Sequence, residues 1–176
     1  VAQTTCTVCA AGQYQDTDTT CDLCPEGRWA AGGTAECTCC NAGTWAAEGA
    51  GFSAACGDCP PGHECPAIPS CVKTPCTDGY FSGGGLAACK NCPGGWVQDT
   101  ASGATTCDIC VAGQFQDTST ACSDCPTSEY SASGETSCKS CPTGWVTNGD
   151  KSTCDNCVAG QFQDTSTLCG DCYVGQ

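Results

Sequence analysis

The chain alternates short cysteine-containing segments with polar stretches, and each repeat contains about one large apolar side chain. The repeat is Cys-x-x-Cys-x-x-Gly-x-aromatic, followed by residues rich in Thr, Ser and Asp, as in residues 116–120. No segment places apolar residues at a sustained helical spacing, so the pattern predicts short strands and tight turns. We therefore expect a small disulfide-rich repeat protein, an elongated rod of short β-strands and turns with almost no helix.

Two positions of the repeat carry specific expectations. The glycine three residues after the second cysteine predicts a turn with positive φ, and Ser128 replaces it in one repeat. The aromatic residue just beyond is expected to cover the disulfide and the neighbouring turn, or to contact a partner. These aromatic residues are Tyr14, Trp29, Trp45, Trp96, Phe115, Tyr130, Trp145 and Phe162.

Cys-x-x-Cys pairs recur ten times, mostly 15 or 16 residues apart, and use twenty of the 24 cysteines. Repeats this short cannot enclose a hydrophobic core, so covalent cross-links must organise the fold. Residues 107–120 return almost verbatim as residues 154–167, which favours a surface displayed periodically over one unique site. The pairs begin at Cys6, Cys21, Cys37, Cys56, Cys89, Cys107, Cys122, Cys138, Cys154 and Cys169.

The repeats divide the chain into three regions. Residues 1–59 hold about four repeats, and residues 89–176 hold about six, the last of them incomplete. Residues 60–88 break the pattern with five of the nine prolines and three extra cysteines, so we expect an irregular insert there. The four cysteines outside the pairs are Cys39, Cys65, Cys71 and Cys76.

Composition places the chain outside the cell. Cysteine exceeds the roughly 8–10% that marks a disulfide scaffold, and such density is expected in an oxidising compartment. We therefore expect a secreted or cell-surface protein. The net charge of −14 argues against binding to nucleic acid or to anionic membranes. No stretch approaches the 18 or more apolar residues of a membrane span, so direct membrane insertion is not expected.

The sequence offers no convincing catalytic or metal site. Cys-x-x-Cys pairs can bind zinc, but ten evenly spaced pairs with a single histidine, His63, favour disulfides. Without a second histidine, a nucleophilic triad would have to use His63, which we interpret as a solvated loop residue. We expect no enzyme activity, no metal and no cofactor, while the many Thr and Ser residues leave room for O-linked glycans.

At this point the pattern resembles known modules. The segment Cys9-Ala-Ala-Gly12-Gln-Tyr14, running to Cys21, resembles the first loop of tumour necrosis factor receptor cysteine-rich domains. It is equally similar to the ephrin-receptor-like cysteine-rich repeats of many eukaryotic surface proteins. The resemblance covers nearly the whole chain outside residues 60–88, and such modules serve as spacers and receptors alike.

The resemblance implies that one disulfide closes each loop, from the second cysteine of a pair to the first cysteine of the next. A rival scheme joins first to first and second to second, as in Cys6 to Cys21 and Cys9 to Cys24, and the sequence leaves both open. The relay scheme joins Cys9 to Cys21, Cys24 to Cys37, Cys40 to Cys56, Cys92 to Cys107, Cys110 to Cys122, Cys125 to Cys138, Cys141 to Cys154 and Cys157 to Cys169.

The relay scheme leaves Cys6 and Cys172 without partners in the chain. The chain also begins in the tail of one repeat and stops one residue before the expected aromatic of another. We therefore expect copies to join head to tail, with Cys6 and Cys172 as the inter-subunit bond, although the array could equally continue in the same polypeptide.

The sequence thus predicts an extracellular structural protein, a subunit or segment of a cell-surface filament, appendage or matrix fibre. Its principal partners would be copies of itself, with other surface proteins or glycans as further candidates. The alternative is a ligand-binding ectodomain of a receptor-type protein, in which residues 60–88 form the recognition surface.

Overall fold

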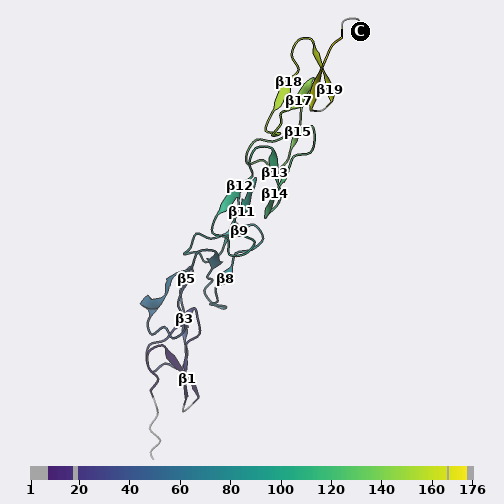
Figure 1. Ribbon diagram of the computed structural model, residues 1–176. Coiled ribbons are helices and arrows are strands. Elements are labelled where there is room, and N and C mark those ends of the chain that lie inside the picture. The colour runs from purple at the N-terminus through teal and green to yellow at the C-terminus, as the bar shows by residue number, and fades with distance from the viewer. Residues whose placement is uncertain (1–7, 18–19, 166, 174–176) are drawn as a thin grey trace, which may run out of the picture. The chain divides into compact units, whose positions relative to one another are not determined.

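A computed structural model of the 176-residue chain describes residues 8–17, 20–165 and 167–173. Among these residues the regular structure consists of short antiparallel strands and one 3-10 turn, η1 (Ser53–Ala55) (Figure 1). Each strand pairs with a single neighbour in sequence, which gives ten two-stranded hairpins in the described part of the chain. The predicted fold class, a disulfide-rich chain of short β-strands with almost no helix, is confirmed.

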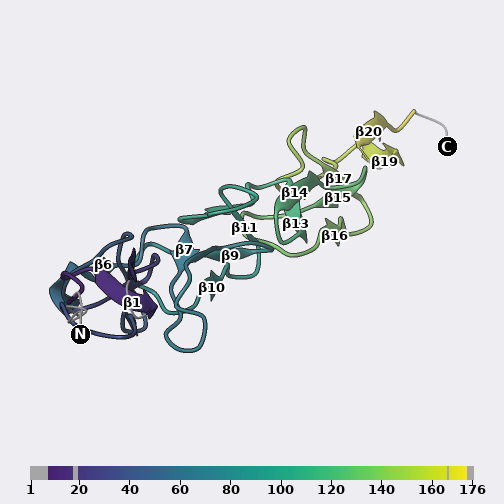
Figure 2. The same ribbon diagram turned by 90° about the horizontal axis from the view of Figure 1, so that it is seen from below.

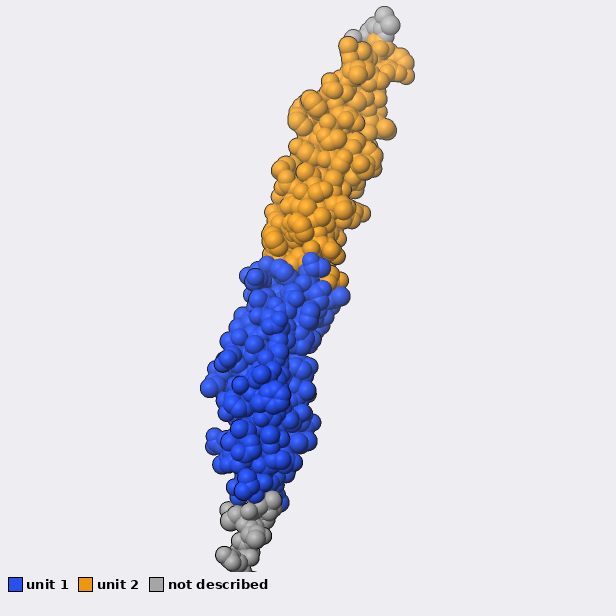
Figure 3. Space-filling model, turned by 90° about the vertical axis from the view of Figure 1, so that its left-hand side faces the viewer, with its two compact units in different colours: residues 1–91, 100–106 blue, residues 92–99, 107–176 orange. Residues whose placement is uncertain are grey.

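The chain divides into two compact units, unit 1 (residues 1–91 and 100–106) and unit 2 (residues 92–99 and 107–176) (Figure 3). The hairpins of unit 1 are β1 (Gln13–Thr17) with β2 (Thr20–Leu23), β3 (Arg28–Trp29) with β4 (Thr38–Cys39), β5 (Thr44–Trp45) with β6 (Gly57–Asp58), β7 (His63–Glu64) with β8 (Thr74–Pro75), and β9 (Tyr80–Phe81) with β10 (Lys90–Asn91).

Unit 2 contains the other five hairpins. Within it, β11 lies beside β13 and β14, and β17 lies beside β19 and β20 (Figure 2). The pairs are β11 (Trp96–Gln98) with β12 (Cys107–Ile109), β13 (Gln114–Thr118) with β14 (Ala121–Asp124), β15 (Glu129–Tyr130) with β16 (Lys139–Ser140), β17 (Trp145–Thr147) with β18 (Cys154–Asn156), and β19 (Gln161–Thr165) with β20 (Leu168–Asp171).

Each hairpin begins at the turn that the repeat predicts. The glycine before β13, Gly113, has φ +83°, a conformation that is costly for residues with a Cβ atom. Ser128, which replaces the glycine before β15, adopts the same left-handed region with φ +74°. The turn is therefore a property of the repeat, and its geometry persists even where the glycine is lost.

Sulphur atoms and small side chains form the interior. A two-stranded hairpin presents too little surface to bury a large apolar group, so most of the buried positions are the second cysteine of a pair or the residue three positions after the turn glycine. We call the latter the junction residue. Val146 is the one branched apolar side chain among the buried residues of the described chain. The most buried residues include the second cysteines Cys24, Cys59, Cys110 and Cys125, the junction residues Ala30, Ala46, Ser82 and Ser131, and also Cys76 and Ala104.

The repeat geometry continues through residues 60–88, where the sequence predicts an irregular insert. Both β7–β8 and β9–β10 are antiparallel hairpins of the same kind as their neighbours. Lys73 stands three residues before Cys76, where a Cys-x-x-Cys pair would have its first cysteine. Cys59, left without that partner, bonds Cys65 instead. The segment is therefore two further hairpins whose cysteine pattern has changed.

Candidate functional site: the hairpin junctions

Eleven disulfides are present among the described residues. Eight of them join the second cysteine of a pair to the first cysteine of the next, 12 to 16 residues later, as in the relay scheme. These are Cys9–Cys21, Cys24–Cys37, Cys40–Cys56, Cys92–Cys107, Cys110–Cys122, Cys125–Cys138, Cys141–Cys154 and Cys157–Cys169.

The other three disulfides use the cysteines outside the pairs. Cys76 bonds Cys89 across 13 residues and so closes a loop of ordinary size. Cys39 bonds Cys71, 32 residues later, and ties the segment after β7 to the hairpin β3–β4. Residues 60–88 are therefore cross-linked to the preceding part of unit 1.

Of the two cysteines predicted to form an inter-subunit bond, the structure describes only Cys172. Cys172 has a free thiol and is exposed, whereas its counterparts Cys24 and Cys125 are fully buried in disulfides. Cys6 lies outside the described residues.

Consecutive hairpins are joined mainly by backbone hydrogen bonds. The amide of the turn glycine donates to the carbonyl of the junction residue in the next hairpin, and the small size of that residue allows the close approach. This bond joins Gly12 to Ala30 (2.9 Å), Gly27 to Ala46 (2.8 Å), Gly43 to Cys65 (2.9 Å), Gly62 to Ser82 (2.7 Å) and Gly113 to Ser131 (2.9 Å).

A second bond runs in the opposite direction. A glycine in the loop of one hairpin donates its amide to the carbonyl of the second cysteine in the hairpin before it. In the loop after β17, the side-chain ammonium of Lys151 takes this role and donates to the carbonyl of Cys125. The backbone version joins Gly33 to Cys9 (2.9 Å), Gly49 to Cys24 (2.9 Å), Gly85 to Cys59 (2.8 Å), Gly103 to Cys76 (2.8 Å) and Gly134 to Cys110 (2.8 Å).

The junction before β13–β14 uses a side chain instead of the backbone. Gln116 is the junction residue, and its Oε1 accepts from the Gly95 amide at 2.8 Å while its Nε2 donates to the Trp96 carbonyl at 2.8 Å. In the equivalent hairpin β19–β20, Oε1 of Gln163 accepts from the Gly144 amide at 3.0 Å. A glutamine at this position therefore acts as a clamp on the preceding turn.

The predicted aromatic residues take up two environments. Six are half-buried, namely Tyr14, Trp29, Trp45, Trp96, Phe115 and Tyr130, while Trp145 and Phe162 are 40% and 49% exposed. The indole of Trp45 lies under the Lys73 ammonium, 3.8 Å from its centroid, and its own Nε1 is buried without a hydrogen-bond partner.

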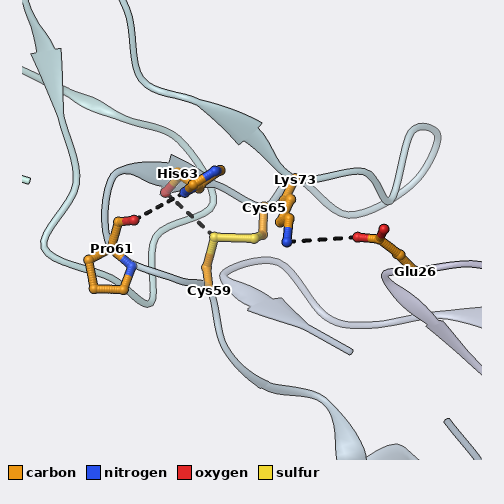
Figure 4. Close-up of polar contacts among 6 residues, drawn as sticks. All are labelled: Glu26, Cys59, Pro61, His63, Cys65 and Lys73. Atoms are coloured by element: carbon orange, nitrogen blue, oxygen red, sulfur yellow. Dashed lines mark hydrogen bonds and ion pairs between the residues drawn. A yellow bond between two sulfur atoms is a disulfide. The ribbon is translucent and has the colours of Figure 1, made fainter. Parts of the chain in front are cut away.

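Lys73 also approaches Glu26 at 3.8 Å (Figure 4). One cation therefore faces both the Trp45 ring and a carboxylate. The ion pair is solvent-accessible and contributes little by itself. The Cys59–Cys65 disulfide lies nearby, and His63 Nδ1 is 3.0 Å from the Pro61 carbonyl (Figure 4). The imidazole of His63 therefore makes a local contact with the loop of its own hairpin.

The ionisable groups with altered pKa are exposed and local. The side-chain hydroxyl and the amide of Ser152 both donate to Asp150 and lower the pKa of its carboxyl. The hydrogen bond to Glu135 at 2.8 Å, followed by the charge of that carboxylate, raises the pKa of Lys139. Both interactions order surface loops.

The hollows on the described surface are shallow and open. Two of them have volumes of about 320 and 360 Å³; the first is lined by Glu64, Thr77 and Tyr80, the second by Tyr14 and Arg28. Within the described residues, no three His, Cys, Asp or Glu side chains are grouped to hold a metal ion. The most regular chemistry of the molecule is therefore the hydrogen bonding at the junctions. The sequence does not predict these hydrogen bonds, because the small residues at the junction positions follow no pattern that marks them as contact residues.

No known protein-family model matches the chain. No curated protein matches its sequence. The structure itself is that of a cysteine-rich module built from short strand pairs, and its many disulfides indicate an extracellular or secreted protein. No helix in the described part of the chain has the length and apolar character needed to cross a membrane.

Proposed function

We propose that this protein is an extracellular structural repeat protein, a subunit or segment of a cell-surface filament, appendage or matrix fibre assembled head to tail. The observation that carries the proposal is the junction between hairpins, which depends on backbone groups and recurs along the chain. An interface of this kind can be repeated along an array, because each hairpin presents the same backbone groups to the hairpin that follows it.

The disulfides support the same proposal. A chain of two-stranded hairpins buries little apolar surface, so its stability outside the cell must come from cross-links that reductants in the cytosol would open. The eight relay loops of 12 to 16 residues also favour kinship with receptor-type or ephrin-receptor-like cysteine-rich modules. A net charge of −14 keeps copies apart unless specific contacts join them.

One observation favours a second candidate, a ligand-binding ectodomain. The loop between β7 and β8 is held by two disulfides, Cys59–Cys65 and Cys39–Cys71, and it displays Ile68 at 81% exposure. A constrained loop with an exposed apolar side chain is suited to insertion into a protein partner.

Electron microscopy of native material, prepared without reductant, separates the two candidates. The filament proposal predicts long regular fibres whose repeat matches a whole number of hairpins. Dispersed short particles without end-to-end association would contradict it and favour the receptor. Treatment with a reductant is the control, since fibres that depend on disulfide-closed hairpins should then dissolve.

A further inference from the structure

We propose that unit 1 binds an acidic sugar, a hexuronate, in the hollow beside the Cys24–Cys37 disulfide, where the Arg28 guanidinium and the Cys37 amide hold its carboxylate. This hollow has a volume of about 360 Å³ and is lined by residues of the hairpins β1–β2 and β3–β4. The inference goes beyond the proposed structural function and does not depend on it.

A second hollow of unit 1, beside the Cys76–Cys89 disulfide, has the same place in the repeat. There the protein supplies a carboxylate of its own. Oε2 of Glu64 accepts from the Cys89 amide at 3.0 Å, and Oε1 accepts from the Thr74 hydroxyl at 3.1 Å. The amide of the first cysteine of a pair therefore binds a carboxylate that comes from the preceding hairpin.

In the hollow beside Cys24–Cys37 the corresponding amide is open. Tyr14 stands at the position of Glu64, two residues after the turn glycine, and its side chain offers no carboxylate. The Cys37 amide donates to no residue that the structure describes. An acceptor from a ligand can therefore take the place that the Glu64 carboxylate occupies in the other hollow.

Arg28 adds a cation to this open hollow. It is the only arginine of the chain, and Tyr80 has its position in the other hollow. The Arg28 guanidinium forms no hydrogen bond or ion pair within residues 8–17, 20–165 and 167–173. Because a guanidinium presents two parallel N–H groups to a carboxylate, Arg28 and the Cys37 amide together suit one carboxylate group.

The hairpin β15–β16 shows that an open amide is not sufficient by itself. The amide of Cys138, also the first cysteine of a pair, has no acceptor among the described residues. Glu129 occupies the position of Arg28 there, and its carboxylate would repel an anion. Since the chain has a single arginine, the combination of an open amide with a guanidinium belongs to the hollow at Arg28 alone.

The remaining lining of the hollow favours a sugar. Tyr14 and Pro25 contribute apolar ring surface, against which the C–H face of a pyranose packs. Glu36 contributes carboxylate oxygens that accept from sugar hydroxyls and repel a ligand with a second negative charge. A hexuronate has one carboxylate, several hydroxyls and an apolar ring face, whereas an acidic peptide brings several negative charges.

The test is an NMR titration of the purified, disulfide-bonded 176-residue chain with sodium glucuronate, and with glucose at equal ionic strength as the neutral control. Glucuronate should shift the Cys37 amide resonance saturably, and glucose should not. Arg28→Gln should weaken binding about tenfold or more, because charge-assisted hydrogen bonds are lost. Lys90→Gln removes the same charge from an exposed residue of β10 and should leave binding unchanged.

A second variant tests the role of the Cys37 amide. Tyr14→Glu places a carboxylate at the position that Glu64 has in the other hollow. This carboxylate should occupy the Cys37 amide within the chain and so abolish the shift caused by glucuronate. Unchanged glucuronate binding in Tyr14→Glu would contradict the assignment of that amide. A count of free thiols checks that each variant has folded.

The other outcomes also decide the inference. Absence of a saturable shift at Cys37, or equal binding by the parent and Arg28→Gln, overturns the site. A tetra-aspartate peptide that binds as tightly as glucuronate overturns the assignment to a sugar. Electron microscopy of native fibres tests the proposed structural function separately, so failure of the one is distinguishable from failure of the other.

Discussion

At the scale of single residues, a turn glycine can meet two requirements, a left-handed backbone conformation and the close approach of another loop. Gly113 adopts a left-handed φ, and a Cβ atom built on it would lie 2.1 Å from the Asp150 carbonyl oxygen. The first requirement is readable from the sequence, because a glycine at fixed spacing after a cysteine indicates a turn. The second is not, because the carbonyl comes from a loop 37 residues away.

The two requirements can be separated by a matched pair of variants. Gly113→Ala should suffer both the left-handed penalty and the clash with Asp150. Gly144→Ala should suffer the penalty alone, about 1–2 kcal/mol, because Gly144 has φ +82° and open space around it.

We therefore expect Gly113→Ala to lower the free energy of opening by about 1–3 kcal/mol more than Gly144→Ala does. Amide hydrogen exchange across β13–β14 and β17–β18 measures the difference. Equal losses in the two variants would show that the close approach to Asp150 carries no energetic weight.

At the scale of the hairpin, the junction residue decides how neighbours join. Where it is Ala30, Ser82 or Ser131, the backbone makes the bond, and where it is Gln116 the side chain does. The sequence predicts the strands and turns, because alternation of glycine, aromatic and polar residues is local. It does not predict the junctions, because small residues at one position carry no pattern that marks them.

The glutamine clamp gives a prediction at this scale. Gln116→Ala should remove both bonds to the preceding turn, so the Gly95 amide should exchange with solvent faster by about tenfold or more. Gln114→Ala is the control, since its side chain bonds Asp124 at 2.9 Å within its own hairpin.

Amide exchange followed by NMR reports on Gly95 directly. Unchanged protection of Gly95 in Gln116→Ala, or equal loss in both variants, would mean that the clamp does not hold the turn. The Cys110–Cys122 disulfide spans both substituted positions, so both variants should retain their hairpin.

Residues 60–88 illustrate where sequence patterns lose their meaning. Lys73 stands where the repeat would have a cysteine, and Cys65 and Cys71 are additional cysteines. The cysteine pattern therefore predicts an insert, although the backbone forms two antiparallel hairpins there. The hairpins persist because their ladders depend on the backbone and on turn glycines such as Gly62, with φ +76°. The cysteine count alone could not distinguish a broken repeat from a rewired one.

At the scale of the whole molecule, disulfides stabilise the fold in place of a hydrophobic core. The eleven disulfides use 22 of the 24 cysteines, while the buried side chains are mostly cysteine, alanine and serine. Each relay loop of 12 to 16 residues contributes about 3 kcal/mol in the chain-entropy account, which is comparable to a well-buried side chain. The fold class follows from this dependence on disulfides, which also indicates an extracellular or secreted protein.

The most direct test of this account is disulfide mapping of the native chain by proteolysis and mass spectrometry without reductant. The account predicts linked peptides that contain Cys110 with Cys122 and Cys125 with Cys138, each second cysteine joined to the next first cysteine. Peptides that link Cys107 to Cys122 and Cys110 to Cys125, or a chain whose thiols are mostly free, would contradict it.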